Sequence, residues 1–435
     1  MKHAKTKTAA DSKKEGITMK KILRAFVSIL IGSALTFHLN PAHAQRLPEP
    51  KPFHAERPRP FPKALPLPSS VPQFGDPLPG LTAAQLEAFA TGVTEFENIE
   101  TPESGLGPIF NDVSCVACHS VPATGGSSDT LVTRFGRLTN GHFDPLTEKG
   151  GSLLQKFAIT PAAQEVVPRE ANVIIHRQAT ALFGVGLIEA IPDEVLQQNA
   201  ARLKVDGVRG HAAQVLDVAS GQMRIGHFGW KAQQATLLAF SADAYLNEMG
   251  ITSRLFPTEN APNGNTNLLA LYDLVADPED QVDPITGKGD IDVNADFMRF
   301  LGPPPPLPLT PSARGGQSLF HQIGCAICHE PTLFTAPNAI AALNQKPVPL
   351  FSDLLLHNMG SLNDGIAQGD ASPFEMKTAP LWGLRASAPY LHDGRAATVD
   401  QAIQAHDGEG LRSRVRYQQL TPTQRRQLLD FLDSN

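Results

Sequence analysis

Cys325-Ala-Ile-Cys328-His329 is the stretch that decides the fold, and it occurs a second time as Cys115-Val-Ala-Cys118-His119. The two copies use all four cysteines of the 435-residue chain. In a Cys-x-x-Cys-His motif the two thiols attach a haem covalently, and the histidine ligates its iron. We therefore expect two covalently bound c-type haems, with His119 and His329 as axial ligands of the iron.

Two other uses of paired cysteines fit this pattern less well. A zinc ribbon has its two Cys-x-x-Cys pairs about 15–20 residues apart, whereas these pairs are in opposite halves of the chain. A thioredoxin-like pair would explain neither the histidine that follows nor the second copy.

The N-terminus has the features of an export signal. Basic residues within Lys20–Arg24 accompany an apolar run over 22–37, and small residues precede a cleavage site after Ala44. The apolar run is short for a membrane anchor, which is the alternative. We expect residues 1–44 to be a signal peptide, with Met19 a second candidate start, and the mature protein to be periplasmic, where bacteria attach haem to protein.

Composition and proline runs predict the domain organisation. The net charge of −6 gives no basic surface for a nucleic acid, so we expect no such partner. Residues 45–79 are rich in proline and predict an extended segment. Four consecutive prolines end at Pro306 and can neither continue a helix nor join a sheet. We therefore place a haem domain with insertions at 80–306 and a second haem domain at 307–435.

The two predicted domains have the same order of elements, which predicts an internal duplication. Each has a lead-in helix, a haem motif, a long loop and a closing helix. Thr82 is expected to cap the first lead-in helix and Thr421 the last closing helix, where Pro422 suits the first turn. No stretch alternates long enough to predict a substantial sheet. The expected fold is mainly α, with two cytochrome c-like haem domains and long loops.

Residues 378–403 read TAPLWGLRASAPYLHDGRAATVDQAI and resemble the C-terminal domain of bacterial dihaem cytochrome c peroxidases. Within that superfamily the chain is most similar to the dihaem "thiol oxidoreductase" or peroxidase-like family, which the segments at 182–193, 228–232, 248–253 and 354–360 also fit. The resemblance covers residues 80–435. It implies a haem-dependent oxidoreductase in which the C-terminal haem relays electrons to a catalytic N-terminal haem that reduces peroxide or oxidises a substrate.

The second axial ligand of the C-terminal haem distinguishes this chain from the peroxidases. His357, Met359, His392 and His406 are the candidates. Where the peroxidases have a methionine ligand, this chain has His406, so the resemblance implies that His329 and His406 hold the iron together. Imidazole in place of a thioether should lower the haem potential. Met359 is the alternative ligand, and His392 is expected to orient groups beside the haem.

His142, His176, His211 and His227 could each reach the other face of the N-terminal haem, and the alternative is an open face that admits peroxide. Peroxide cleavage needs an acid or base beside the iron. Glu189 is the candidate, because it lies in an apolar stretch where burial would raise its pKa. The relatives have a glutamate and a glutamine in this pocket, which makes Gln178 its companion, and Glu194 is the competitor.

The resemblance implies further roles. Trp230 would carry electrons between the haems, Arg385 and Arg395 would bind haem propionates, and a calcium ion between the domains would contact Ser387, Pro389 and Asn140. It also implies a small cytochrome or copper protein as redox partner, peroxide or a small molecule as substrate, and a homodimer.

Two other functions remain open. An electron carrier would have both irons six-coordinate, and a dioxygen-activating dihaem oxygenase would have an open first iron. The word "thiol" in the family name "thiol oxidoreductase" has no support in this sequence, because haem attachment would leave no cysteine free.

Overall fold

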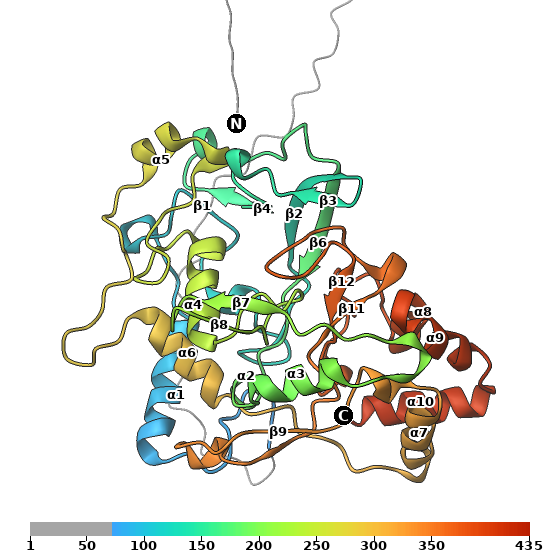
Figure 1. Cartoon of the computed structure of the whole chain (residues 1–435). Helices are drawn as coiled ribbons and strands as arrows, with labels where there is room; N and C mark the ends of the chain where they lie inside the picture. The colour runs from blue at the N-terminus through green and yellow to red at the C-terminus, as the bar shows by residue number, and fades with distance from the viewer. Residues whose placement is uncertain (1–71) are drawn as a thin grey trace, which may run out of the picture. The chain divides into compact units, whose positions relative to one another are not determined.

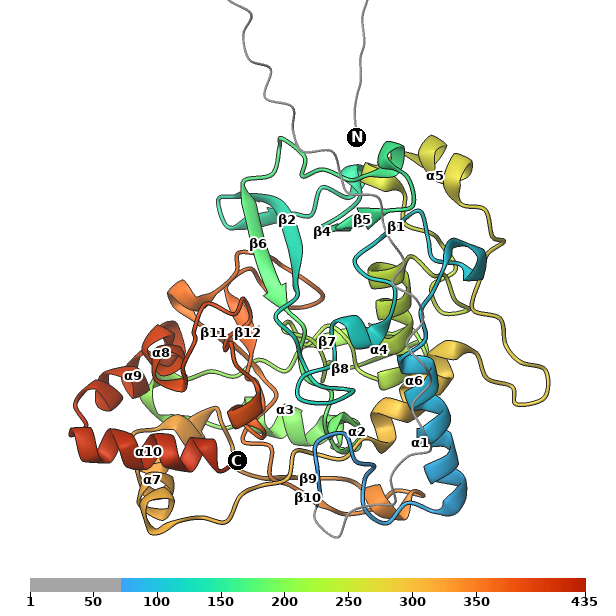
Figure 2. The same cartoon turned by 180° about the vertical axis from the view of Figure 1, so that it is seen from behind.

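The computed structural model describes residues 72–435, which contain ten α-helices and twelve strands (Figures 1 and 2). The predicted signal peptide and most of the proline-rich segment lie outside the described residues. No helix in the described part is both long and apolar enough to cross a bilayer. The described residues belong to one compact unit.

Helices account for more of the described residues than strands do, in agreement with the mainly α prediction. The helices are α1 (Ala83–Phe96), α2 (Val185–Glu189), α3 (Asp193–Ala201), α4 (Leu237–Ala244), α5 (Thr266–Tyr272), α6 (Asp290–Phe300), α7 (Pro311–Gln322), α8 (Val399–Ala405), α9 (Leu411–Gln418) and α10 (Pro422–Asp433). The strands are β1 (Ile109–Phe110), β2 (Leu131–Thr139), β3 (His142–Asp144), β4 (Leu153–Leu154), β5 (Phe157–Ala158), β6 (Val173–Gln178), β7 (Gln214–Asp217), β8 (Gln222–Ile225), β9 (Leu333–Phe334), β10 (Pro347–Val348), β11 (Leu356–Asn358) and β12 (Glu375–Lys377).

Two helix pairs flank the two haem motifs. The lead-in helix α1 packs against α6, and the lead-in helix α7 packs against α10; each pair runs side by side in both views. Phe96 at the end of α1 stacks near Phe297 of α6, with ring centroids 4.6 Å apart. Phe320 of α7 meets Phe431 of α10 at 5.5 Å. The two motifs thus have matching supports, while the duplication itself stays a prediction.

The predicted helix starts are confirmed. The Thr82 side chain accepts a hydrogen bond from the Gln85 N–H, and Gln85 returns one to the Thr82 N–H, which is a capping box. Thr421 and Gln424 form the same arrangement at the start of α10, with Pro422 in the first turn. Local sequence is sufficient here because each cap needs only residues three positions apart.

The structure corrects the prediction that no segment forms a substantial sheet. β2 is nine residues long and pairs antiparallel with β3, β4 and β6. Its first residue, Leu131, lies opposite Gln178 at the end of β6. Neither strand alternates along its whole length: half-buried and buried residues follow one another through the middle of β2, and β6 ends on two successive buried residues. This sheet brings Gln178 to the first haem motif.

The main hydrophobic core crosses the predicted domain boundary near Leu307. Leu182, Phe228 and Phe297, from before the boundary, share one cluster with Leu350 and Leu355 from after it. A smaller cluster around α7 and α10 includes Cys325. The predicted division at 306 and 307 stays a prediction, but the two sides bury apolar surface together.

Candidate functional site

The first haem motif presents a histidine ready to ligate a metal. Cys115–Ala117 form one 3-10 turn, and His119 follows it with its Nδ1–H donating to the Gly126 carbonyl at 3.0 Å. Burial lowers the pKa of His119, which favours the neutral imidazole that binds metals. The backbone of Thr180 also interacts with the ring, and because the Gly126 carbonyl holds Nδ1, Nε2 is the nitrogen that iron would use.

The second motif repeats this arrangement. Cys325–Ile327 form a 3-10 turn, and the His329 Nδ1–H donates to the Phe351 carbonyl at 3.0 Å. Burial lowers the pKa of His329 to about 4. A lead-in phenylalanine contacts the histidine ring in each motif: Phe96 lies 6.0 Å from His119, and Phe320 lies 6.4 Å from His329, between centroids.

His406 lies where a second ligand of the same iron would be. Its ring centroid is 6.4 Å from that of His329. Two metal–nitrogen bonds of about 2 Å each, together with the distance from each nitrogen to its ring centre, add up to roughly 6 Å. The His406 Nδ1–H donates to the Ala402 carbonyl at 2.8 Å, so Nε2 is again free. Burial also lowers the pKa of His406. The pair therefore fits one haem iron between the two rings.

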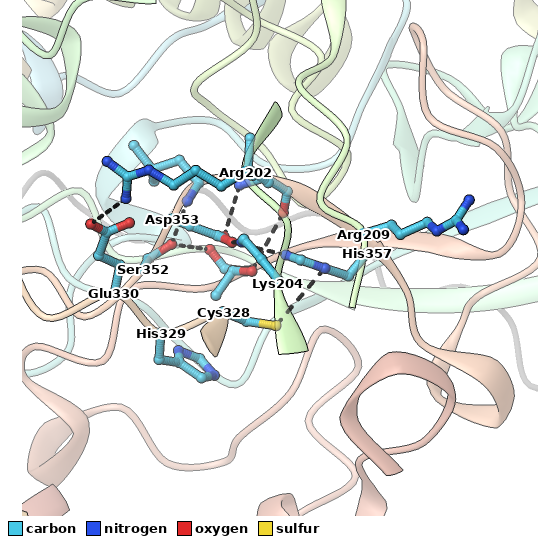
Figure 3. Close-up of polar contacts among 12 residues, drawn as sticks. Arg202, Lys204, Arg209, Cys328, His329, Glu330, Ser352, Asp353 and His357 are labelled. Atoms are coloured by element: carbon cyan, nitrogen blue, oxygen red, sulfur yellow. Dashed lines mark hydrogen bonds and ion pairs between the residues drawn. The ribbon is translucent and has the colours of Figure 1, made fainter. Parts of the chain in front are cut away.

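His357 is engaged elsewhere and is not available as that ligand (Figure 3). Its Nε2 lies 3.0 Å from Asp353 Oδ2, and its Nδ1 lies 2.7 Å from Glu409 Oε2. Burial opposes the charge on the ring, but the hydrogen bonds with Asp353, Cys328 and Glu409 outweigh it and raise the pKa of His357 well above its usual value. His357 Nδ1 also lies 3.8 Å from the Cys328 sulfur, so this charged ring stands directly beside the second motif.

A segment from the first half of the chain contacts residues beside the second motif. Lys204, which follows α3, forms an ion pair with Asp353 at 2.5 Å. Arg202 reaches Glu330, the residue after His329, at 3.4 Å. These contacts, drawn in Figure 3, attach the α3 segment to the second haem motif.

The first motif opens into a cavity. The space between its walls is about 1210 Å³ when the solvent at its mouth is included. Cys115, Cys118 and His119 all line it. None of the four cysteines is in a disulfide. The residues present therefore fit a covalently attached haem in this cavity.

Two carboxylates project into the cavity from one helix. Asp243 is in α4, and Glu248 is in the π-helical turn Tyr245–Met249 that extends it. Residues five apart on an α-helix point in different directions, but the wider π turn brings them to the same wall. Burial raises the pKa of both carboxyl groups. Glu248 is held by the Asn111 amide, whose Nδ2 donates to it at 2.7 Å.

Gln178 and Trp230 also line this cavity, as their predicted roles require. The Gln178 side chain is buried and donates to the Ser128 carbonyl at 2.8 Å, while its own oxygen has no hydrogen-bond partner. The Trp230 Nε1–H donates to the Gln178 carbonyl at 2.8 Å. The Trp230 ring meets the His392 ring edge-on at 6.2 Å. Burial lowers the pKa of His392 to about 4.

Glu189 lies outside the cavity, so the structure does not support its predicted catalytic role. One carboxylate oxygen accepts the Leu237 N–H at 2.8 Å, at the start of α4. The other accepts the Arg299 Nε–H at 2.9 Å. The apolar stretch around Glu189 is buried because α2 packs against α6, and the carboxylate there caps one helix and pairs with another. Glu194 does not line the cavity either.

The two arginines predicted to bind propionates have protein partners. Arg385 donates to the carbonyls of Pro305 and Asn435 and lies over the Phe74 ring. It therefore joins the chain end to the proline run. Arg395 is exposed and pairs with Asp393, two residues earlier.

Asn140 is too far from Ser387 and Pro389 to share a calcium ion with them. It follows the end of β2, whose first residue lies opposite Gln178. Gln178 and Pro389 lie close together, because both are within 3.4 Å of the position that a Cβ of Gly394 would take. Nine residues of strand span roughly 30 Å, so Asn140 is at the far end of the hairpin.

Sequence reasoning missed Asp243 and Glu248. The segment that begins at Glu248 contributed to the family resemblance, but nothing in it showed that a π turn would direct the side chain into the cavity. No local pattern of residues marks such a turn. Only the packed helix shows which carboxylates share a wall.

Comparison with known proteins gives one family. Residues 166–435, more than half of the chain, match the family described as "Di-haem oxidoreductase, putative peroxidase". The match begins after the first haem motif and includes the second. No curated protein matches the chain.

Two of the solved structures that resemble the chain show how weak these likenesses are. A hydrazine synthase from Kuenenia stuttgartiensis is 14% identical, with 87% of this chain and 100% of that chain covered, at a TM-score of 0.38. A MauG-like protein associated with microbial copper homeostasis is 15% identical, with 86% and 95% covered, at a TM-score of 0.39. Scores at this level carry no conclusion about fold or function.

Proposed function

The chain belongs to the di-haem oxidoreductase family, and we propose that it is a periplasmic enzyme of the peroxidase type. The haem at Cys325 and Cys328 would relay electrons to a catalytic haem at Cys115 and Cys118. The electrons would come from a small cytochrome or copper protein, and the substrate would be peroxide or a small molecule oxidised at the first haem.

The asymmetry between the two motifs carries this proposal. At the second motif, His329 and His406 face each other at the separation of two ligands on one iron. At the first motif, the histidine faces a cavity, and no other histidine of the described residues lines it. A filled iron suits electron relay and an open iron suits catalysis.

Cavity residues can supply the proton transfer that peroxide reduction needs. Bound haem would supply the redox chemistry. Burial raises the pKa of Glu248, and a carboxyl group with a raised pKa can donate a proton as well as accept one. Gln178 has an unpaired oxygen in the same cavity, which can accept a hydrogen bond from peroxide or water. Trp230 donates a hydrogen bond to the Gln178 carbonyl and packs edge-on against the His392 ring, and we assign it electron passage between the motifs.

One observation favours a second function, that of an electron carrier. Met249 and Met298 also line the cavity, and a thioether is a common sixth ligand of a c-type haem. If either sulfur bound the first iron, both haems would be six-coordinate and peroxide would have no place to bind.

Electron paramagnetic resonance of the diferric protein separates these functions. We expect a high-spin signal from the first haem and a low-spin signal from the second. His406→Ala should replace the low-spin signal of the second haem by a high-spin one and leave the signal of the first haem unchanged, and His142→Ala, on the exposed β2–β3 hairpin, should change neither signal. Two low-spin signals from the diferric protein, with the haem that remains ferric after one-electron reduction still low-spin, would contradict the peroxidase function and support the carrier.

A further inference from the structure

We propose that Glu259, Asp277 and Glu279 form a binding site for a calcium ion. These residues come from the loop after the π turn and from the loop before α6. The site is separate from both haem motifs, and it shares no residue with the calcium site that the family resemblance implied. The proposal does not depend on the proposed function.

The spacing of the three carboxylates fits calcium. One oxygen from each lies within 4.8 Å of the others. Oxygen atoms that share a Ca²⁺ ion lie up to roughly 5 Å apart, so this spacing is compatible with one. The ligands offered are oxygens alone, and they come from loops, which suits the flexible coordination of calcium better than the strict octahedron of magnesium. Calcium is thus favoured over magnesium and over metals that need nitrogen or sulfur.

Glu259 gives an independent indication that a cation belongs here. Its side chain is buried, with the residue only 7% exposed. Neither carboxylate oxygen has a hydrogen-bond partner of ordinary geometry, and the backbone of the adjacent Asn260 is the only group that lowers its pKa. A buried carboxylate without partners is costly unless an ion or a proton compensates its charge. Its Oε1 lies close to Gly107: a Cβ added to that glycine would be 2.9 Å from the oxygen.

The charges around Glu259 are all of one sign. Glu279, Asp273 and Asp277 each act on it as negative neighbours, and together with burial they raise the pKa of Glu259 to about 9. None of these four carboxylates forms an ion pair with an arginine or lysine of the described residues, and the nearby Arg254 is paired with Asp292. Thr252 donates its hydroxyl toward Asp277 and Glu279 and orients them. A divalent cation would compensate this charge.

The ion would stabilise one wall of the first haem cavity. Gly107 donates its N–H to the Met249 carbonyl at 3.0 Å, and Met249 lines the cavity beside Glu248. A cation that joins Glu259 to the Asp277 loop would therefore hold the segment that leads into the first haem motif. We expect calcium to affect stability first and the first haem through it.

Calorimetric titration of the calcium-stripped, haem-loaded protein tests the proposal. We expect one calcium ion to bind, magnesium to bind much more weakly, and saturating calcium to raise Tm by roughly 5 °C. Glu259→Gln should abolish this binding and the rise in Tm, yet leave the stripped protein at least as stable as the wild type, since a buried charge is removed. Glu170→Gln, at an exposed carboxylate, should keep both responses.

Asp277→Asn provides a second variant if Glu259→Gln does not fold, because Asp277 is exposed and its replacement disturbs no core. It should weaken calcium binding at least tenfold. Wild-type protein that binds no calcium, or variants that bind it as tightly as the wild type, would overturn the proposal. Neither result would bear on the spin states of the haems, so this proposal and the proposed function can fail separately.

Discussion

At the scale of single residues, environment decides what each carboxylate does. Glu189 and Glu248 are both glutamates near the first motif. Glu189 gives its oxygens to a helix start and to Arg299. Glu248 faces the cavity, where burial raises its pKa. Only the second is placed to exchange a proton with a bound substrate.

Glu248→Gln should therefore lower peroxide turnover by about 10²–10⁴-fold, the usual contribution of an acid–base group. The amide keeps the shape of the side chain but cannot transfer the proton. The measurement is steady-state peroxide reduction with a reduced donor, with haem spectra to show that both haems remain. Glu189→Gln should keep turnover and lose stability instead, and the reverse pattern would restore Glu189 to the catalytic role.

Glu95 predicts a pH dependence of stability. Burial, and next the charge of Asp290, raise the pKa of Glu95 from 4.5 to about 7, although the Tyr245 hydroxyl donates to it at 3.0 Å. A raised pKa means that the folded state holds the Glu95 proton more tightly than the unfolded state does. The stability that this proton contributes is therefore complete below pH 4.5 and is lost as pH rises through 7.

Glu95→Gln should remove this loss, and at pH 8 the variant should be more stable than the wild type by about 1–3 kcal/mol. At pH 4 the two proteins should differ little. Denaturant unfolding at both pH values measures this. Glu87→Gln, on the exposed side of α1, should match the wild type at each pH, and an equal gain at pH 4 would contradict the explanation.

At the scale of elements, close helix contacts support the haem motifs. α1 can approach α6 because Gly92 has no side chain: an added Cβ would lie 2.6 Å from Phe297 Cβ and 3.0 Å from the Val293 carbonyl oxygen. Gly316 has the same role where α7 meets α10, with the Gln427 carbonyl oxygen 1.9 Å from an added Cβ. In both pairs a glycine sets the distance between the helices.

Gly92→Ala should destabilise the protein by about 1–3 kcal/mol, even though alanine favours the helix itself by about 1 kcal/mol. The new methyl group would push α6 away and shift Phe96 from the His119 ring. Thermal unfolding and the spectrum of the first haem report this. Thr91→Ala, at the exposed neighbouring position, should be close to neutral. A Gly92→Ala protein as stable as the wild type would show that the helices can separate without cost.

At the scale of the whole molecule, a buried ion network joins the regions on either side of the predicted domain boundary. Asp364 lies 2.8 Å from Arg177 Nε and 2.9 Å from Lys231 Nζ. The Lys231 and Asp364 side chains are fully buried. Arg177 also lines the first haem cavity. The network therefore links the cavity wall to the chain that follows the second motif.

Asp364→Asn should lower the free energy of unfolding by about 3–5 kcal/mol, because two buried cations would lose their shared anion. Denaturant unfolding checks the loss. Asp129→Asn makes the same chemical change at an exposed position and should alter stability little. If Asp364→Asn were as stable as Asp129→Asn, the buried ion network would contribute nothing to the free energy of unfolding.

Local sequence was sufficient for some features of this protein and tertiary packing was needed for the rest. The two Cys-x-x-Cys-His motifs and the helix starts at Thr82 and Thr421 follow from residues a few positions apart, so short stretches determine them. The resemblance pointed to His406, and the structure brings it opposite His329.

Only the tertiary structure decided which carboxylates share the haem cavity, which share the proposed calcium site, and that Asn140 lies far from Pro389. These groupings join segments distant in sequence, and they depend on a π turn, a strand pairing and loop positions. The physical reason is that such contacts arise from packing between elements, whose geometry no single stretch of sequence contains.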